Sequence, residues 1–360
     1  MFCSKCGKEY SENLPCCPHC TPSTQQNTPV QPTEHLFPYP HTLPEQPKKK
    51  SKLPLIIIAI VLVAAIAAGA ILLPGLLKKD DTDTESNSET VTVWALTSVN
   101  VGAQGATIYD YKISYDENGN KQSIVYTTNW EGTNTVTTKF EYDESGRLSK
   151  AVSYYENGSE RNHRIFTYNA DNRLIRVADY YPDGRNYQSA EYEYDANGNQ
   201  ISHTDSYSGK ITYEYNEKNQ CIKETHDTHV YTYEYDADGN KTKAFYNGHL
   251  STEYIYSDGN LIKEIEYGDG EETLRREFTC DSKGRPISGV LYEYGEKSIT
   301  LSVEYDKNGN CVKKILTSVE EDFPVIISFE YVSFNVSAEK AEEIKEYNED
   351  IFEATDLFKP

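Results

Sequence analysis

"YEYDANGNQI", residues 192–201, decides the fold, because close variants of it recur along the chain. The variants are "FEYDESGRLS" at 140–149, "YEYDADGNKT" at 233–242 and "VEYDKNGNCV" at 303–312. Taken alone, the stretch looks like a small acidic site, since Glu193, Asp195, Asn197 and Asn199 offer oxygen ligands of the kind that calcium takes. Its recurrence predicts a repeated structural unit instead.

The repeated unit is a short turn after an anchor residue, and it occurs nine times at spacings of 20 to 27 residues. An Asp or Asn follows the anchor in eight copies, where its side-chain oxygen can accept from the backbone ahead in a type I turn. A Gly or Asn then supplies the left-handed φ that a hairpin with a G1 bulge needs. Each copy therefore predicts a β-hairpin. The anchors are Tyr115, Tyr142, Tyr168, Tyr194, Tyr215, Tyr235, Tyr256, Cys280 and Tyr305.

The strands flanking each turn show a two-residue period. Tyr192 and Tyr194 share one face, while Glu193 points to the other. Three residues after the turn Gly or Asn, six copies carry an aliphatic residue, so we expect an aromatic–aliphatic face on each hairpin. These residues are Ile175, Ile201, Ile222, Ile262, Ile287 and Val312. The acids on the opposite face (Glu193, Glu214, Glu234 and Glu304) are those expected of a solvated surface rather than of a glycosidase pair.

Further turn signals connect the copies. They are "NG" at 157–158, "DG" at 183–184, "SG" at 208–209, "NG" at 247–248 and "DG" at 269–270. The pattern predicts an antiparallel meander of roughly 18 strands, and sheets of that size curl or coil.

With its Tyr-Asp-x-x-Gly-(Arg/Asn) motif, the segment from about 109 to 316 resembles the YD repeats of RHS proteins. The resemblance implies hairpins wound into a spiralling β-sheet shell, as in polymorphic toxins and adhesive cell-surface proteins. Arg147, Arg173 and Arg285 keep the usual Arg, and Asn or Gln elsewhere is a departure. Nine copies are few for a closed shell and no toxin domain follows them, so we expect a short coiled or partly open sheet.

The end of the chain predicts a cap for that array. In "FPVIISFEYVSF" the residues Val325, Ile327, Phe329 and Tyr331 alternate on one face of a final strand. Ser337 then N-caps a helix that carries Ala341, Ile344, Tyr347 and Ile351 on one stripe. An open repeat array needs such end caps.

Before the repeats lies an uncharged apolar segment, residues 53–73. Twenty-one helical residues span about 31 Å, which matches a bilayer core of about 30 Å. A signal peptide would lie at the N-terminus with a shorter apolar core, so we expect a single transmembrane helix. More lysines precede the span than follow it, which predicts a cytoplasmic N-terminus and an extracellular repeat domain at the plasma membrane.

Charge is divided in the same way along the chain. Residues 1–79 hold 8 basic and 4 acidic residues, which leaves 27 and 53 for the remainder, a net charge of −26. So acidic a segment should repel nucleic acid and anionic surfaces. Tyrosine is also concentrated there, with 27 of the 30 tyrosines between Tyr109 and Tyr331.

"CSKC" and "CPHC" near the N-terminus predict a zinc site. Cys3, Cys6, Cys17 and Cys20 form two CxxC pairs that can bring four thiolates to one tetrahedral Zn²⁺. Residues 2–20 resemble the short bacterial zinc ribbons that precede a single membrane span, although Cys16 could compete with Cys17. A thiol–disulfide oxidoreductase would need a βαβ scaffold around "CPHC", which the sequence does not supply. Only Lys5 and Lys8 are basic there, so no nucleic acid is expected as a partner.

Other candidate sites fit structural explanations. "DADGN" lacks the Gly and Glu positions of an EF-hand. His226 and His229 are interpreted as surface residues, and Cys221, Cys280 and Cys311 as small core residues, with a disulfide between repeats as the alternative. No nucleophile–base arrangement or phosphate loop is evident.

We therefore expect a mainly β protein: an antiparallel β-hairpin array of the YD/RHS kind with a C-terminal capping helix, plus a small zinc ribbon and one transmembrane helix. The expected parts are the zinc ribbon (1–20), a Pro/Thr/Gln-rich and basic linker (21–52), the transmembrane helix (53–77), an acidic stalk and first strand (78–106), the YD-repeat domain (107–336) and the capping helix (337–360).

The function expected from these parts is that of a non-enzymatic single-pass membrane protein. Its repeat face would bind carbohydrate or protein at the cell surface, because tyrosines offer flat contact area with a hydroxyl tip. An envelope sensor that relays external binding to the zinc ribbon is the alternative. An enzyme acting on cell-wall glycans is the least favoured interpretation.

Overall fold

A computed structural model describes residues 90–129, 132–206, 208–321 and 323–354. The predicted zinc ribbon, linker and membrane segment lie outside these residues. Within the described ranges, no helix combines the length and apolarity needed to cross a membrane.

Twenty strands and one helix make up the described fold. Most strands begin directly after a turn predicted from the sequence. The strands are β1 Val91–Ala103, β2 Ala106–Tyr115, β3 Lys121–Thr128, β4 Asn134–Tyr142, β5 Leu148–Tyr155, β6 Glu160–Tyr168, β7 Leu174–Tyr180, β8 Asn186–Tyr194, β9 Gln200–Asp205, β10 Gly209–Tyr215, β11 Cys221–Thr225, β12 Val230–Tyr235, β13 Lys241–Tyr246, β14 His249–Ser257, β15 Asn260–Gly268, β16 Glu271–Cys280, β17 Pro286–Glu293, β18 Glu296–Tyr305, β19 Cys311–Ser318 and β20 Val325–Val336, followed by α2 Ala338–Ala354.

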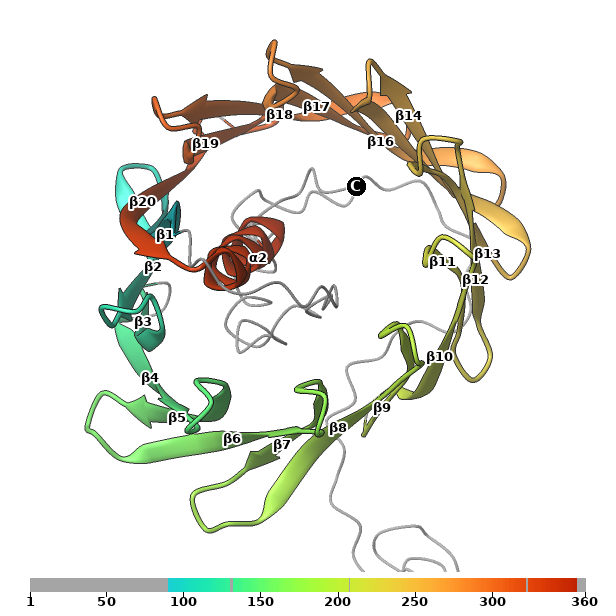
Figure 1. Ribbon diagram of the computed structural model, residues 1–360. Helices are drawn as coiled ribbons and strands as arrows, with labels where there is room; N and C mark the ends of the chain where they lie inside the picture. The colour runs from blue at the N-terminus through green and yellow to red at the C-terminus, as the bar shows by residue number, and fades with distance from the viewer. Residues whose placement is uncertain (1–89, 130–131, 207, 322, 355–360) are drawn as a thin grey trace, which may run out of the picture. The chain divides into compact units, whose positions relative to one another are not determined.

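Each strand pairs antiparallel with the next along the chain, and β20 pairs in turn with β1. The sheet is therefore a closed ring (Figure 1). The expectation of a partly open sheet is wrong. The sheet closes because β1 (13 residues) and β20 (12 residues) pair along twelve positions, so that neither end of the sheet keeps a free edge.

The predicted hairpin turns are confirmed in their backbone. Gly198 has φ 92° and Asn172 φ 62°, the left-handed conformation that a G1 bulge needs. A Cβ on Gly198 would also lie 2.9 Å from the terminal guanidinium of Arg173, which would have to shift. The register shifts by one residue at each such turn, for example between Glu193 and Tyr194.

That bulge corrects the predicted aliphatic face. The partner of Tyr194 is Gln200 and the partner of Glu193 is Ser202, so Ile201 is the extra residue of the bulge. Ile201 is 37 % exposed and Ile287 38 % exposed. None of the six aliphatic residues belongs to the buried clusters of the described part. The strict two-residue alternation of faces ends at the bulge, and the sequence period alone does not show where a bulge lies.

The largest core lies where the ring closes. Leu96, Val99 and Val101 of β1 are at most 1 % exposed and pack with side chains of β2 and β16–β20. The predicted alternation in β20 is confirmed, since Val325, Ile327 and Phe329 are buried and Tyr331 packs against them. A smaller cluster on β5–β8 includes Ala151, Phe166 and Tyr192.

Helix α2 covers this seam rather than an open end of the array. Lys340 N–H donates to Ser337 Oγ at 3.2 Å, which confirms the predicted N-cap. Ala341, Ile344 and Tyr347 are buried, the first two with Val93, Ala95 and Val336.

The Asn348 side chain joins α2 to β1. It accepts from Leu96 N–H at 3.0 Å and donates to the Trp94 carbonyl at 2.6 Å. β2 pairs with β1 only from Ser98 onward, so the Asn348 amide takes the place of a strand partner beside Trp94 and Leu96.

The anchor tyrosines point to the face of the sheet on which α2 lies. Lys121, the first residue after the first turn, places Nζ 3.4 Å from the centre of the Tyr347 ring. Glu343 of α2 contributes to the raised pKa values of Tyr142 and Tyr168, after the larger effect of burial. Figure 1 shows α2 enclosed by the ring, so this face is the inner face.

Candidate functional site: the two rims of the ring

The antiparallel meander sorts all turns into two sets. Turns that follow even-numbered strands are the nine YD turns, and together they form what we call the YD rim. Turns that follow odd-numbered strands lie at the other end of the strands and form the opposite rim. The two rims differ in the polar and aromatic side chains that they carry.

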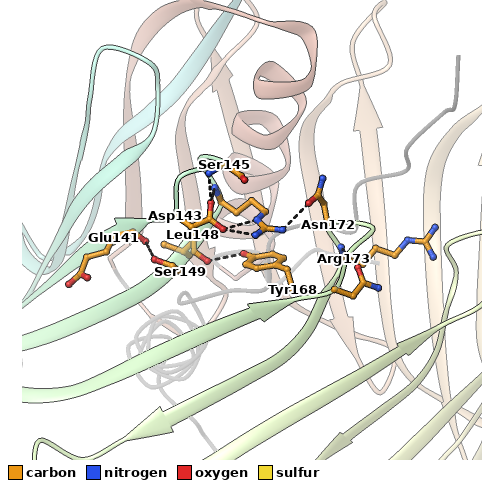
Figure 2. Close-up of polar contacts among 10 residues, drawn as sticks. Glu141, Asp143, Ser145, Leu148, Ser149, Tyr168, Asn172 and Arg173 are labelled. Carbon is orange, nitrogen blue, oxygen red and sulfur yellow. Dashed lines mark hydrogen bonds and ion pairs between the residues drawn. The ribbon is translucent and has the colours of Figure 1, made fainter. Parts of the chain in front are cut away.

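On the YD rim, the acidic residue holds its own turn. Asp143 Oδ1 accepts from the N–H groups of Ser145 and Arg147 at 2.9 and 3.0 Å, and Oδ2 accepts from Arg147 Nε at 2.8 Å (Figure 2). Asp195 does the same with Asn197 and Asn199. These bonds hold the pKa of Asp143 below its usual value, first through the Arg147 side chain.

Most anchor tyrosines fasten their hairpin to the preceding part of the sheet, and Tyr331 of β20 makes the same kind of bond. Tyr168 Oη donates to the Leu148 carbonyl at 2.9 Å, across the gap between two consecutive YD turns (Figure 2). In every such bond after the first, the acceptor begins the strand that follows the preceding YD turn. We call these bonds tyrosine latches. The donors are Tyr115, Tyr142, Tyr168, Tyr194, Tyr215, Tyr235, Tyr305 and Tyr331.

Arginines of the motif reinforce the same connection. The Arg147 guanidinium lies 4.8 Å from the centre of the Tyr168 ring, and its Nη1 donates to Asn172 Oδ1 at 2.8 Å in the next turn (Figure 2). Arg285 stacks on Tyr305 at 4.3 Å in the same way. The YD rim is thus a chain of turn-to-turn contacts, and its polar groups are engaged in holding the fold.

Removing one latch should have a measurable cost. Tyr168→Phe deletes the hydroxyl that donates to the Leu148 carbonyl, and a lost hydrogen bond of this kind costs about 0.5–1.5 kcal/mol of unfolding free energy. Urea denaturation of the purified protein measures it. Tyr181→Phe is the control, because the exposed Tyr181 ring should tolerate the change within about 0.5 kcal/mol. Equal stability of Tyr168→Phe and the parent would show that the latch contributes nothing.

Burial gives the tyrosines an unusual titration. It raises the pKa of Tyr168, Tyr192 and Tyr213 from 10.0 to about 12. The folded state therefore favours the neutral phenol, so this stabilisation is complete below pH 10.0 and is lost as the pH rises through about 12. We expect the unfolding free energy to fall over that window. Tyrosinate absorbance should rise at higher pH in the native than in the urea-unfolded protein, and superimposable titration curves would contradict this.

Other residues singled out from the sequence have structural partners. His226 and His229 are half-buried rather than on the surface: His226 Nε2 lies 2.6 Å from Glu224 Oε1, and the His229 ring stacks on Tyr246. Cys221, Cys280 and Cys311 carry free thiols and are half-buried, so the alternative of a disulfide between repeats is not realised. Cys280 stands at an anchor position and has no hydroxyl with which to form a latch.

Buried ion pairs occur on the inner face. Arg164 Nε and Nη2 donate to the two Asp179 oxygens at 2.6 and 2.8 Å, and the side chains are only 17 % and 7 % exposed. Among the described residues, no three His, Cys, Asp or Glu side chains gather as a metal site would require. Cys3, Cys6, Cys17 and Cys20 lie outside those residues.

The exposed tyrosines lie on the opposite rim. Within the described ranges they are Tyr155, Tyr181, Tyr246 and Tyr294, and each ends or directly follows an odd-numbered strand. The anchor tyrosines are half-buried and offer less exposed surface than these four, and the ligand expected on the repeat face stays a prediction. The signal in the sequence is a Tyr just before the connecting turns, outside the YD motif.

Two opposite-rim turns have the geometry of YD turns with a different residue. Tyr155 N–H donates to the Ser159 carbonyl, and Tyr181 N–H to the Arg185 carbonyl, each at 2.9 Å. Asp143 N–H donates to Arg147 in the same way on the YD rim. The turns therefore put tyrosine where the YD turn has aspartate, and the ring extends toward solvent instead of capping the backbone.

The described residues therefore form hairpins with YD-type turns in a closed sheet, an arrangement similar to a YD shell. Residues 86–244 match the teneurin YD-shell family, which is less than half of the chain. The match ends in β13, after the sixth YD turn. The seventh turn, "YSDGN", is one residue short, and Cys280 replaces the anchor tyrosine of the eighth. No curated protein matches the sequence significantly.

Several solved structures show distant similarity. The TcdB2–TccC3–Cdc42 structure is 14 % identical, with 61 % of this chain and 18 % of that chain covered at a TM-score of 0.28. A porin-like protein from Bacteroides uniformis is 12 % identical over 66 % of this chain and 98 % of that one, at 0.23. A putative outer membrane lipoprotein-sorting protein domain from Vibrio parahaemolyticus is 9 % identical over 74 % and 92 %, at 0.23. This chain thus spans less than a fifth of TcdB2–TccC3–Cdc42.

Proposed function

We propose that the protein is a non-enzymatic, single-pass membrane protein that presents its closed YD-repeat ring outside the cell for binding to carbohydrate or protein. The observation that carries the proposal is the division of the tyrosines between the rims. Most anchor tyrosines hold neighbouring hairpins together through the tyrosine latches. The tyrosines of the opposite rim are exposed and make no latch. Exposed aromatic side chains with a hydroxyl tip suit recognition.

Anchoring rests on residues 53–73, which are uncharged and apolar over the length of a bilayer core. They precede β1 by fewer than twenty residues, most of them acidic, Ser or Thr. Such a stalk keeps the ring near the outer surface of the membrane. The lysine-rich side of the span then lies in the cytoplasm.

The two CxxC pairs complete the proposal. Cys3, Cys6, Cys17 and Cys20 would hold one Zn²⁺, which supplies folding free energy to a segment too short for a core. Zinc analysis should find about one Zn²⁺ per chain in the parent and in the Cys16→Ser control, and loss of zinc in Cys3→Ser. Zinc retained by Cys17→Ser but lost from Cys16→Ser would overturn the ligand set.

Protease accessibility in intact cells tests the topology. A tag on the C-terminus should be removed by added protease before the cells are permeabilised, because the ring lies outside. A tag on the N-terminus of the same chain should be protected until permeabilisation. The reverse pattern, or protection of both tags, would reject the proposed function.

A further inference from the structure

The hairpins β5–β6 and β7–β8 carry a group of exposed aromatic and charged side chains at their tips. They lie next to one another in the sheet and project outward from the ring (Figure 1). We call the exposed Tyr155, Tyr181, Asp183 and Arg185, together with the half-buried Tyr187, the tip cluster. Tyr155 is 48 % and Tyr181 45 % exposed. Both stand at turn positions that carry a polar Asp or Asn on the YD rim.

The rings of the tip cluster are held in place. Tyr181 and Tyr187 pack with centroids 4.6 Å apart, and the Arg185 guanidinium lies 5.3 Å from the Tyr181 ring centre. Asn162 of the neighbouring hairpin donates from Nδ2 to Tyr187 Oη at 2.9 Å. Arg161 lies 5.9 Å from the Tyr155 ring centre. Side chains fixed in this way lose less entropy when a ligand binds.

Planar polar groups stand beside these rings. Arg185 Nε donates to Asp183 Oδ2 at 2.7 Å, with the two side chains 76 % and 54 % exposed. A pair so exposed contributes little to stability. Its guanidinium and carboxylate still have donors and acceptors directed to solvent, in the fork geometry that binds two neighbouring groups at once.

We propose that the tip cluster binds a neutral polysaccharide. A sugar ring has an apolar C–H face that packs on an aromatic ring and adjacent hydroxyls that a carboxylate or guanidinium can bind in pairs. Two strand spacings of about 4.8 Å separate β5 from β7, so one extended glycan chain can contact both hairpins. The net charge of −26 on residues 80–360 opposes an anionic polymer, which leaves a neutral one.

This inference rests on the proposed function and names both its site and its ligand class. It differs from the earlier expectation, since the contact surface comes from the connecting turns and not from the YD motif. A repetitive polymer also allows Tyr155 and Tyr181 to be engaged together, which raises the effective affinity.

Binding of the full-length protein in detergent to a glycan array, followed by titration with soluble β-glucan, mannan and N-acetylglucosamine oligomers, tests the proposal. We expect at least one neutral glycan to bind, and Tyr155→Ala and Tyr181→Ala each to weaken it about tenfold. Tyr294→Ala is the matched control, because Tyr294 is 79 % exposed but lies on the separate β17–β18 hairpin; its affinity should be unchanged.

Several results would overturn the inference. They are the absence of binding to any neutral glycan, a preference for anionic glycans, binding to protein alone, or a glycan affinity that Tyr181→Ala leaves unchanged. Each substitution lies at an exposed tip, and unchanged urea denaturation of the variants would confirm that they fold. If the protease assay places the β-sheet ring outside the cell but no glycan binds, this inference alone is rejected. If the C-terminal tag is protected in intact cells, the proposed function is rejected.

Discussion

Replacing Arg164 with methionine is expected to lower the unfolding free energy by about 3–5 kcal/mol, because it leaves Asp179 buried without its cation. The Asp179 side chain is only 7 % exposed and accepts two hydrogen bonds from Arg164 at 2.6 and 2.8 Å. Methionine keeps much of the aliphatic bulk of arginine but offers no donor. Water cannot readily solvate the abandoned carboxylate, which makes this loss larger than that of a surface pair.

The exposed pair Arg185–Asp183 is the matched control for this measurement. Its Nε–Oδ2 distance of 2.7 Å is as short as those in the buried pair, so the two pairs differ mainly in exposure. Arg185→Met should therefore change stability far less than Arg164→Met, because solvent screens this exposed pair. Adding Asp179→Leu to Arg164→Met should recover most of the loss, since no buried charge then remains. Equal effects of Arg164→Met and Arg185→Met would show that burial does not decide the contribution.

Truncating the closure core should be comparably destabilising. Phe329 of β20 is 3 % exposed and pairs with Val99 of β1, so Phe329→Ala leaves a cavity where the two ends of the sheet meet. The expected loss is about 3–5 kcal/mol of unfolding free energy, measured by urea denaturation.

Val332→Ala on the same strand supplies the control. Val332 is 39 % exposed and pairs with Ala95, so its substitution should cost much less than that of Phe329. If Phe329→Ala were no more destabilising than Val332→Ala, the seam between β1 and β20 would not be a packed core.

The hairpins were predictable because the residues within each turn are sufficient to specify its conformation. An Asp or Asn that caps the backbone and a Gly or Asn at positive φ, such as Gly198 and Asn172, specify the turn without help from the rest of the chain. The final strand and the Ser337 cap were predictable for the same reason. The alternation of the acids was too, since Glu193 and its counterparts are exposed as expected.

Closure could not be predicted, because it depends on contacts between distant segments. A first strand was predicted within residues 78–106, but its pairing with the last strand was not, since Val99 meets Phe329 only in the folded ring. The bulge that turns Ile201 away from the tyrosine face is likewise a consequence of pairing register. The candidate binding residues were not predicted because Tyr155 and Tyr181 are tyrosines like the anchors, and their exposure follows from the folded structure.

The ring closure itself can be tested by disulfide trapping between β1 and β20. Thr92 and Asn335 are direct partners with exposed side chains, and Thr92 Oγ1 donates to Asn335 Oδ1 at 2.8 Å. A Thr92→Cys/Asn335→Cys variant should form a disulfide in the native protein, identified as a cross-linked peptide by mass spectrometry, and should not form it in urea. In the Thr92→Cys/Ser333→Cys control the diagonal pair is separated by roughly 7–8 Å, too far for efficient bonding. A native protein that cross-links neither pair, or the control pair in preference, would contradict a closed twenty-stranded ring.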